Sequence, residues 1–155
     1  QLVVPIIKKA YIGLTKIEAC MNEPISTIMT REVFTLSPED TLAKVREVLL
    51  TNRFHHLPVV KGKKLVGIIT SYDLAKLTQE VGEYDRIRVQ DVMTTKIATL
   101  GPAELIGAAA QVFLEHLFHG LPIVDEDHNL VGIVTTHDIL KYQFYKAYPD
   151  HRKYW

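Results

Sequence analysis

The hydrophobic positions of the chain follow two different periods. Within residues 42–49, apolar side chains recur every three or four positions, which is the spacing of one face of a helix. Residues 57–60 and 65–69 are short apolar runs rich in β-branched side chains, and the polar residues 61–64 separate them. Runs of this kind joined by a short polar turn are typical of a β-hairpin. The pattern therefore predicts a helix followed by two antiparallel strands.

Two further elements frame this helix and hairpin. A short β-rich segment at residues 33–36 comes first and ends before Pro38, because proline cannot serve a central ladder. Ser37 and Asp40 are the candidate caps for the start of the helix. A last helix is predicted to start near Thr70, directly after the hairpin. The predicted order of elements is thus β-α-β-β-α.

The whole pattern occurs twice in the chain. Three pairs of blocks recur in the same order: IMTREVFTLSP with VMTTKIATLGP, FHHLPVV with FHGLPIV, and LVGIITSYDLAK with LVGIVTTHDILK. A repeat of about sixty residues buries only a small share of its surface alone, so the two copies are expected to share one core. We predict an α+β fold in which two β-α-β-β-α repeats pack through their sheets with pseudo-two-fold symmetry.

The repeats divide the chain into four parts. These are an N-terminal extension (1–22), a first repeat (23–82), a second repeat (83–145) and a C-terminal tail (146–155). The link between the repeats is short and polar. Such a link favours close packing of the two repeats over two loosely tethered domains.

Charge and composition exclude several classes of function. The 155 residues carry 18 Lys and Arg side chains and 18 Asp and Glu side chains, so the formal net charge is zero. A protein that binds nucleic acid chiefly through its phosphates normally has a basic excess, so nucleic acid is not the expected partner. The single cysteine, Cys20, excludes an internal disulfide and fits a cytoplasmic location. No apolar stretch is long enough to insert across a bilayer.

The sequence also lacks the motifs of the common enzyme classes. It contains no Gly-x-x-x-x-Gly-Lys-Ser/Thr loop, no Gly-x-Gly-x-x-Gly fingerprint and no Gly-x-Ser-x-Gly elbow. His116 and His119 lie three positions apart, but no His-Glu-x-x-His motif accompanies them, so no metal site is predicted. We expect a protein that is not an enzyme and requires no cofactor for its fold.

The repeated motifs resemble those of a tandem pair of CBS (cystathionine β-synthase) domains, also called a Bateman module. The resemblance rests on Met-Thr, on His-x-Leu-Pro-hydrophobic-Val and on Leu-Val-Gly-Ile-x-Thr-x-x-Asp, each of which occurs twice. It covers residues 23–145. It implies a regulatory module that binds AMP, ADP or ATP in two clefts between the repeats, forms a homodimer and signals to an effector protein.

The resemblance also assigns binding residues to each cleft. The first cleft is expected to use Thr70, Asp73, Ile97, Ala98, His119 and His137. The second is expected to use Thr135, Asp138, Val33, Phe34, His55 and His56. In the family the aspartate accepts hydrogen bonds from the ribose hydroxyls, while threonine, histidine and backbone N–H groups face the phosphates. Gly120 stands where the family tends to have a basic residue, which weakens the phosphate end of one cleft.

Several alternatives stay open. Thr-x-x-Asp is also a capping pattern, in which both side chains stabilise the start of a helix without any ligand. The ligand could instead be S-adenosylmethionine, and Mg²⁺ could accompany a nucleotide. The pair could also be a structural or assembly module with no bound nucleotide, or a binder of nucleic acid through a local patch.

Overall fold

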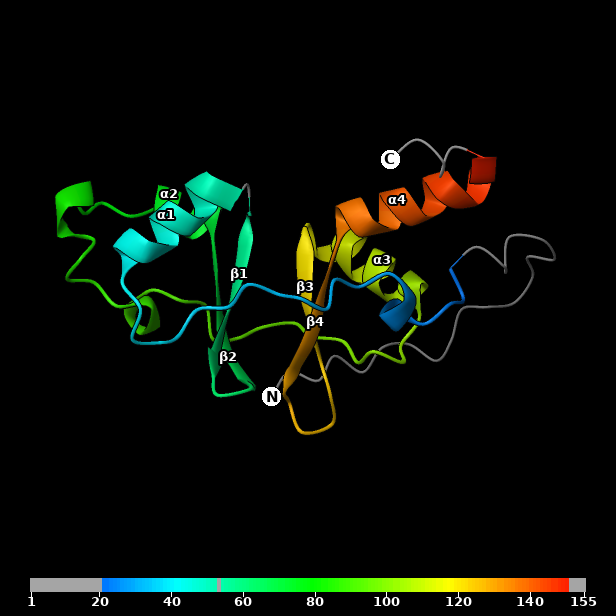
Figure 1. Cartoon of the computed structure of the whole chain (residues 1–155), viewed down its shortest axis with the longest axis horizontal. Helices are drawn as coiled ribbons and strands as arrows, with labels where there is room; N and C mark the ends of the chain where they lie inside the picture. The colour runs from blue at the N-terminus through cyan, green and yellow to red at the C-terminus, as the bar shows by residue number, and fades with distance from the viewer. Residues whose placement is uncertain (1–20, 53, 151–155) are drawn as a thin grey trace.

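The computed structural model describes residues 21–52 and 54–150, and Figure 1 shows how its elements are arranged. The first repeat contains α1 (Leu42–Asn52), β1 (His56–Lys61), β2 (Lys64–Thr70) and α2 (Ser71–Ala75). The second contains α3 (Ile106–His116), β3 (Gly120–Val124), β4 (Leu130–Thr135) and α4 (Thr136–Ala147). The remaining elements are the short 3-10 helices η1 (Ile25–Thr27), η2 (Val81–Glu83) and η3 (Val89–Asp91). Features predicted for residues 1–20 and 151–155 lie outside the described residues.

Each repeat is built on an antiparallel hairpin. β1 pairs with β2, and β3 pairs with β4. The two hairpins lie side by side at the centre of the molecule, with α1 and α2 at one end and α3 and α4 at the other (Figure 1). Lys64 pairs with Asn129, its equivalent in the second repeat, so a pseudo-two-fold axis passes between these two residues. This arrangement confirms the predicted α+β fold of two packed repeats.

The first predicted strand of each repeat is shorter than expected. Leu36 makes a single parallel bridge to Val59, with backbone hydrogen bonds of 2.8 and 2.9 Å on either side. Leu100 makes the equivalent bridge to Ile123. Six residues earlier, Thr30 and Thr94 each pair with the hairpin of the other repeat.

The segment that leads into each repeat crosses to the other repeat. Thr30 pairs with Ile133 of β4 through two backbone hydrogen bonds of 2.9 Å, and Thr94 pairs with Ile68 of β2 in the same way. The two crossings are related by the pseudo-two-fold axis. They join hairpins that would otherwise belong to separate units.

A methionine packs on a glycine at each crossing. A Cβ atom on Gly132 would lie 2.7 Å from the sulfur of Met29, and a Cβ atom on Gly67 would lie 2.3 Å from the sulfur of Met93. At either glycine, an added side chain would therefore force the methionine to move. The methionine of one repeat thus packs closely on the glycine backbone of the other.

The crossing places part of each repeat's core inside the other repeat. Ile25 is fully buried in one core cluster with Ile106, Leu121 and Val134 of the second repeat. Val89, the equivalent residue near the start of the second repeat, is fully buried in the core cluster of the first. Figure 1 shows the first described residues, drawn in blue, beside α3 rather than beside α1. The two repeats therefore share their cores, because each core cluster contains a residue from the other repeat.

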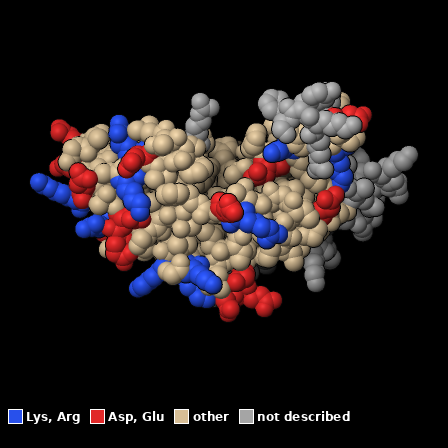
Figure 2. Space-filling view, viewed as in Figure 1, with Lys and Arg blue, Asp and Glu red and all other residues tan. Residues whose placement is uncertain are grey.

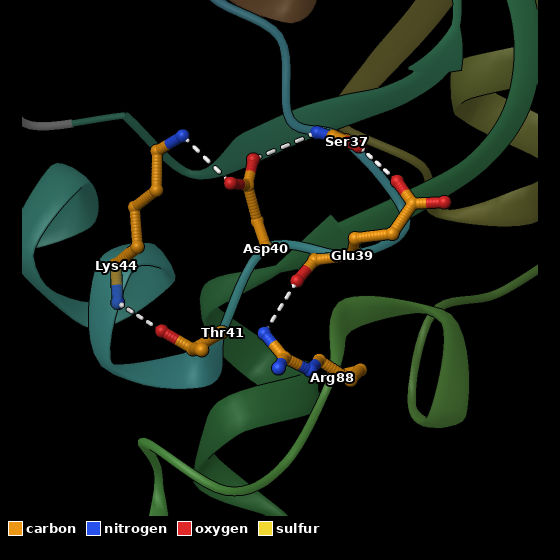
Figure 3. A network of polar contacts seen from close by, with 6 residues as sticks. All are labelled: Ser37, Glu39, Asp40, Thr41, Lys44 and Arg88. Carbon is orange, nitrogen blue, oxygen red and sulfur yellow. Dashed lines mark hydrogen bonds and ion pairs between the residues drawn. The ribbon is translucent and has the colours of Figure 1, made fainter.

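Polar contacts at the start of α1 also tie the second repeat to the first (Figure 3). Thr41 Oγ1 accepts a hydrogen bond from the Lys44 backbone N–H at 3.4 Å. Asp40 accepts from the Ser37 N–H and from Lys44 Nζ, both at 2.8 Å, and Arg88 donates to a backbone carbonyl of this turn at 2.8 Å. Thr41, rather than Ser37 or Asp40, therefore caps the helix, and Asp40 fixes the turn before it.

The surface carries charges of both signs. On the face shown in Figure 2, Lys and Arg side chains are interspersed with Asp and Glu side chains over a surface of mostly uncharged residues. A surface of this kind does not favour tight, non-specific contact with a polyanion. None of the helices in the described part of the chain is long and apolar enough to cross a membrane.

Candidate ligand-binding site

A cavity of about 1060 Å³ lies between the two repeats, where β2 leads into α2 and β4 leads into α4. All twelve residues that the sequence assigns to ligand binding line it. They are Val33, Phe34, His55, His56, Thr70, Asp73, Ile97, Ala98, His119, Thr135, His137 and Asp138. Pockets for one small molecule usually measure about 300–1,000 Å³, so this cavity has room for more than one such ligand.

The crossing segments divide the cavity into two halves. Residues 30–36 run from β4 to β1, whereas residues 94–100 run from β2 to β3. The Glu32 half is therefore formed by the following lining residues: Glu32, Val33, Phe34, Thr135, His137 and Asp138. The Lys96 half is formed by Lys96, Ile97, Ala98, Thr70 and Asp73. The sequence predicts two separate clefts, whereas the structure has one continuous cavity with two halves.

Both aspartates belong to capping boxes. Asp73 Oδ2 accepts hydrogen bonds from the Thr70 N–H at 2.8 Å and from Thr70 Oγ1 at 2.7 Å. Asp138 Oδ2 accepts from the Thr135 N–H at 2.7 Å and from Thr135 Oγ1 at 2.6 Å. The capping interpretation is thus confirmed in both repeats. Among the described residues, none donates to Oδ1 of either aspartate, so each carboxylate keeps one oxygen for another donor.

The threonines position these aspartates. Each threonine hydroxyl gives its only hydrogen to the aspartate and accepts from the aspartate's backbone N–H, at 3.2 Å for Thr70 and 3.3 Å for Thr135. A hydroxyl has a single O–H donor, so neither threonine can donate to a phosphate without releasing its aspartate. The phosphate contact expected from the sequence therefore conflicts with the cap.

Four histidines line the same cavity. The His55 carbonyl accepts from the Ser71 N–H at 3.1 Å, and the His119 carbonyl accepts from the Thr136 N–H at 3.2 Å. Each of these two histidines thus lies beside the Thr–Asp turn of its own repeat. The sequence groups His137 with the turn of the first repeat, but the chain places it in the first turn of α4.

His56 and Gly120 are equivalent positions that meet near the pseudo-two-fold axis. A Cβ atom on Gly120 would lie only 3.0 Å from Cγ of the His56 ring. A side chain at position 120 would therefore require the His56 ring to shift by a few tenths of an ångström.

The environment of His56 disfavours its protonated form. Burial lowers the pKa of His56 below its ordinary value of 6.5, the nearby His119 and His55 lower it further, and Asp73 opposes the shift. The folded protein therefore holds this imidazole neutral at pH values where an unfolded chain would take up a proton.

We expect the free energy of unfolding to fall as the pH is lowered through 6.5, the ordinary pKa of histidine. The unfolded state binds the proton first, so the stability that is complete above this pH is lost below it. Urea unfolding between pH 8 and pH 5 measures the slope. His56→Gln should flatten it, whereas His116→Gln, a change outside the cavity, should not. Equal slopes in wild type and His56→Gln would contradict this account.

Residues that the sequence search missed also line the cavity. Glu32 and Lys96 occupy equivalent positions and carry opposite charges. Phe54 lies against Phe34, with 6.1 Å between the ring centroids, and both rings are about 40% exposed at 39% and 41%. Comparing the repeats position by position would have found the charge reversal, which lies inside the first pair of matching blocks.

Comparison with known proteins identifies the family. The model of the CBS domain matches residues 25–80 and again residues 89–145. The chain is a pair of CBS domains. A relative from Methanocaldococcus jannaschii, the uncharacterized protein MJ1225, is 33% identical over 132 residues, which cover 78% of this chain and 47% of that protein. The chain thus spans less than half the length of this relative.

Solved structures of other CBS pairs have the same fold. CBSX2 in complex with AMP superposes with a TM-score of 0.74 at 26% identity, over 81% of this chain and 98% of that one. The CBS pair of protein MJ0100, in complex with 5′-methylthioadenosine and S-adenosyl-L-methionine, superposes with a TM-score of 0.69 at 28% identity. This match covers 79% of this chain and 97% of that one.

Proposed function

We propose that this CBS pair is a regulatory module that binds adenosine-containing nucleotides (AMP, ADP or ATP) and signals their presence to a partner protein. The observation that carries the proposal is the state of the two cavity aspartates. Asp73 and Asp138 are each fixed through Oδ2, and no described residue donates to Oδ1. A ribose presents two adjacent hydroxyl donors, which suit a carboxylate oxygen held in place in this way.

The rest of the cavity suits the other parts of such a ligand. Ile97 and Ala98 in one half, and Val33 and Phe34 in the other, supply apolar surface for a flat adenine ring. The histidines and the backbone N–H groups at the start of α4 are donors for a phosphate. The adenosine ligands of CBSX2 and of MJ0100 support this class of ligand.

Regulation would follow from the position of the cavity. Because both repeats line it, a ligand that contacts both favours one arrangement of the two repeats over others. A homodimer and an effector protein belong to the same proposal. Leu114 on α3 and Leu140 on α4, which are 82% and 67% exposed, offer apolar contacts to such partners.

Ligand-induced stabilisation tests the proposal. A ligand that binds only the folded state raises the free energy of unfolding, by about 2.7 kcal/mol at one hundred times its dissociation constant. We expect AMP, ADP or ATP to raise the melting temperature, and isothermal titration calorimetry to give the affinity. UMP, which lacks the adenine, is the matched control. No shift with any adenine nucleotide at millimolar concentration would favour a purely structural CBS pair.

A further inference from the structure

The two halves of the cavity differ in fixed charge. The Lys96 half contains one lysine and Asp73, so its fixed charges cancel. The Glu32 half contains Glu32 and Asp138 and no described lysine or arginine, so it carries two negative charges. The fold itself is pseudo-symmetric, and the difference therefore comes from the reversal between Glu32 and Lys96.

Aromatic side chains add to this difference. In the Glu32 half, the exposed ring of Phe34 lies beside that of Phe54. The residue equivalent to Phe34 in the Lys96 half is Ala98, which presents no ring. Two carboxylates beside exposed aromatic faces attract a cation, since aromatic rings bind cations over their faces. The same carboxylates repel a phosphate.

We propose that the two halves select adenosine ligands of opposite charge. The Lys96 half takes a phosphate-bearing nucleotide, because Lys96 offsets Asp73 and its ammonium group attracts the phosphate. The Glu32 half rejects phosphates and takes an adenosine whose 5′ substituent is cationic, of the adenosyl-sulfonium class. This assignment rests on the proposed function, because it requires that adenosine ligands bind in this cavity.

Two matched ligand pairs measure the selectivity. The ratio of the affinities for S-adenosylmethionine and S-adenosylhomocysteine reports the preference for the sulfonium charge, because the second compound lacks that charge. The ratio of the affinities for AMP and adenosine reports the preference for the phosphate. Isothermal titration calorimetry of the full chain at pH 8 gives both ratios.

Single neutralising substitutions assign each preference to its half. Glu32→Gln should lower the sulfonium preference by about three- to tenfold, and Lys96→Gln should lower the phosphate preference by a similar factor. Glu32 and Lys96 are both exposed, so neither change should disturb the fold. Glu126→Gln and Lys63→Gln, which make the same charge changes outside the cavity, should alter neither ratio.

Two kinds of result separate the failure of this inference from the failure of the proposed function. If all four compounds bind but each cavity variant changes both ratios equally, or neither, selection by charge is overturned. The same conclusion follows if wild type shows no preference for the sulfonium charge. If none of the four compounds binds to wild type, the proposed function itself is overturned.

Discussion

The double variant Asp73→Asn, Asp138→Asn is expected to lose measurable binding of adenine nucleotides while it keeps its fold. An asparagine can place its carbonyl oxygen where Oδ2 now accepts from the threonine, so both caps survive. Its amide nitrogen then replaces the carboxylate oxygen that no described residue contacts. A donor would face the ribose hydroxyls where an acceptor is needed, and the negative charge would be lost.

The size of this effect follows from the bonds removed. A hydrogen bond to a charged group contributes about 1.5–3 kcal/mol, so each half should lose about ten- to a hundredfold in affinity. Calorimetry with adenosine, which carries the ribose hydroxyls but no charged group, gives the loss. Asp91→Asn makes the same change in a capping carboxylate outside the cavity, since Asp91 accepts from the Arg88 N–H at 3.3 Å. If the double variant binds adenosine as tightly as wild type does, the aspartates do not contact the ligand.

A second large effect is expected from Ile25→Ala, which should lower the free energy of unfolding by about 2–5 kcal/mol. Ile25 is fully buried, and the change leaves a cavity that the packed core cannot fill. Urea unfolding measures the loss. Leu50→Ala, at a side chain that is 67% exposed, should change stability far less.

The part of the protein that loses stability shows whether the core is built from both repeats or from one repeat alone. Ile25 lies at the start of the first repeat in sequence but packs in the core of the second. Hydrogen exchange should therefore show the greatest loss of protection in β3 and β4. Val89→Ala should produce the mirror result, with the loss in β1 and β2. If Ile25→Ala lowered protection from hydrogen exchange only in the first repeat, this would contradict the packing of Ile25 in the second.

The hairpins and helices could be predicted from the sequence, but the crossing could not. The apolar runs at residues 57–60 and 65–69 report that a strand is buried, and the turn between them fixes which strand it pairs with. Ile25 lies ahead of the first predicted element, which starts at residue 33. Periodicity gives no information on which repeat will bury it, because the two repeats offer nearly the same surface.

The candidate site divides in the same way. Asp73 and Asp138 occur at equivalent positions of a repeated motif, so the single sequence is enough to predict them as ligand-binding residues. Glu32 and Lys96 lie inside the first pair of matching blocks, but at a position where the two copies differ, so a comparison based on shared residues passes over them. The role of the threonines could not be predicted from the sequence. Only the hydrogen-bond geometry shows that each hydroxyl donates its hydrogen to the aspartate.

The crossing of the leading segments also bears on how such a chain arises by gene duplication. A chain with one repeat would have to give its leading segment to a second copy, and its folding would then depend on protein concentration. Joining two repeats turns that encounter into an intramolecular one with a high effective concentration. Once the copies are joined, Glu32 and Lys96 are free to diverge, which is impossible in a symmetric pair of identical chains.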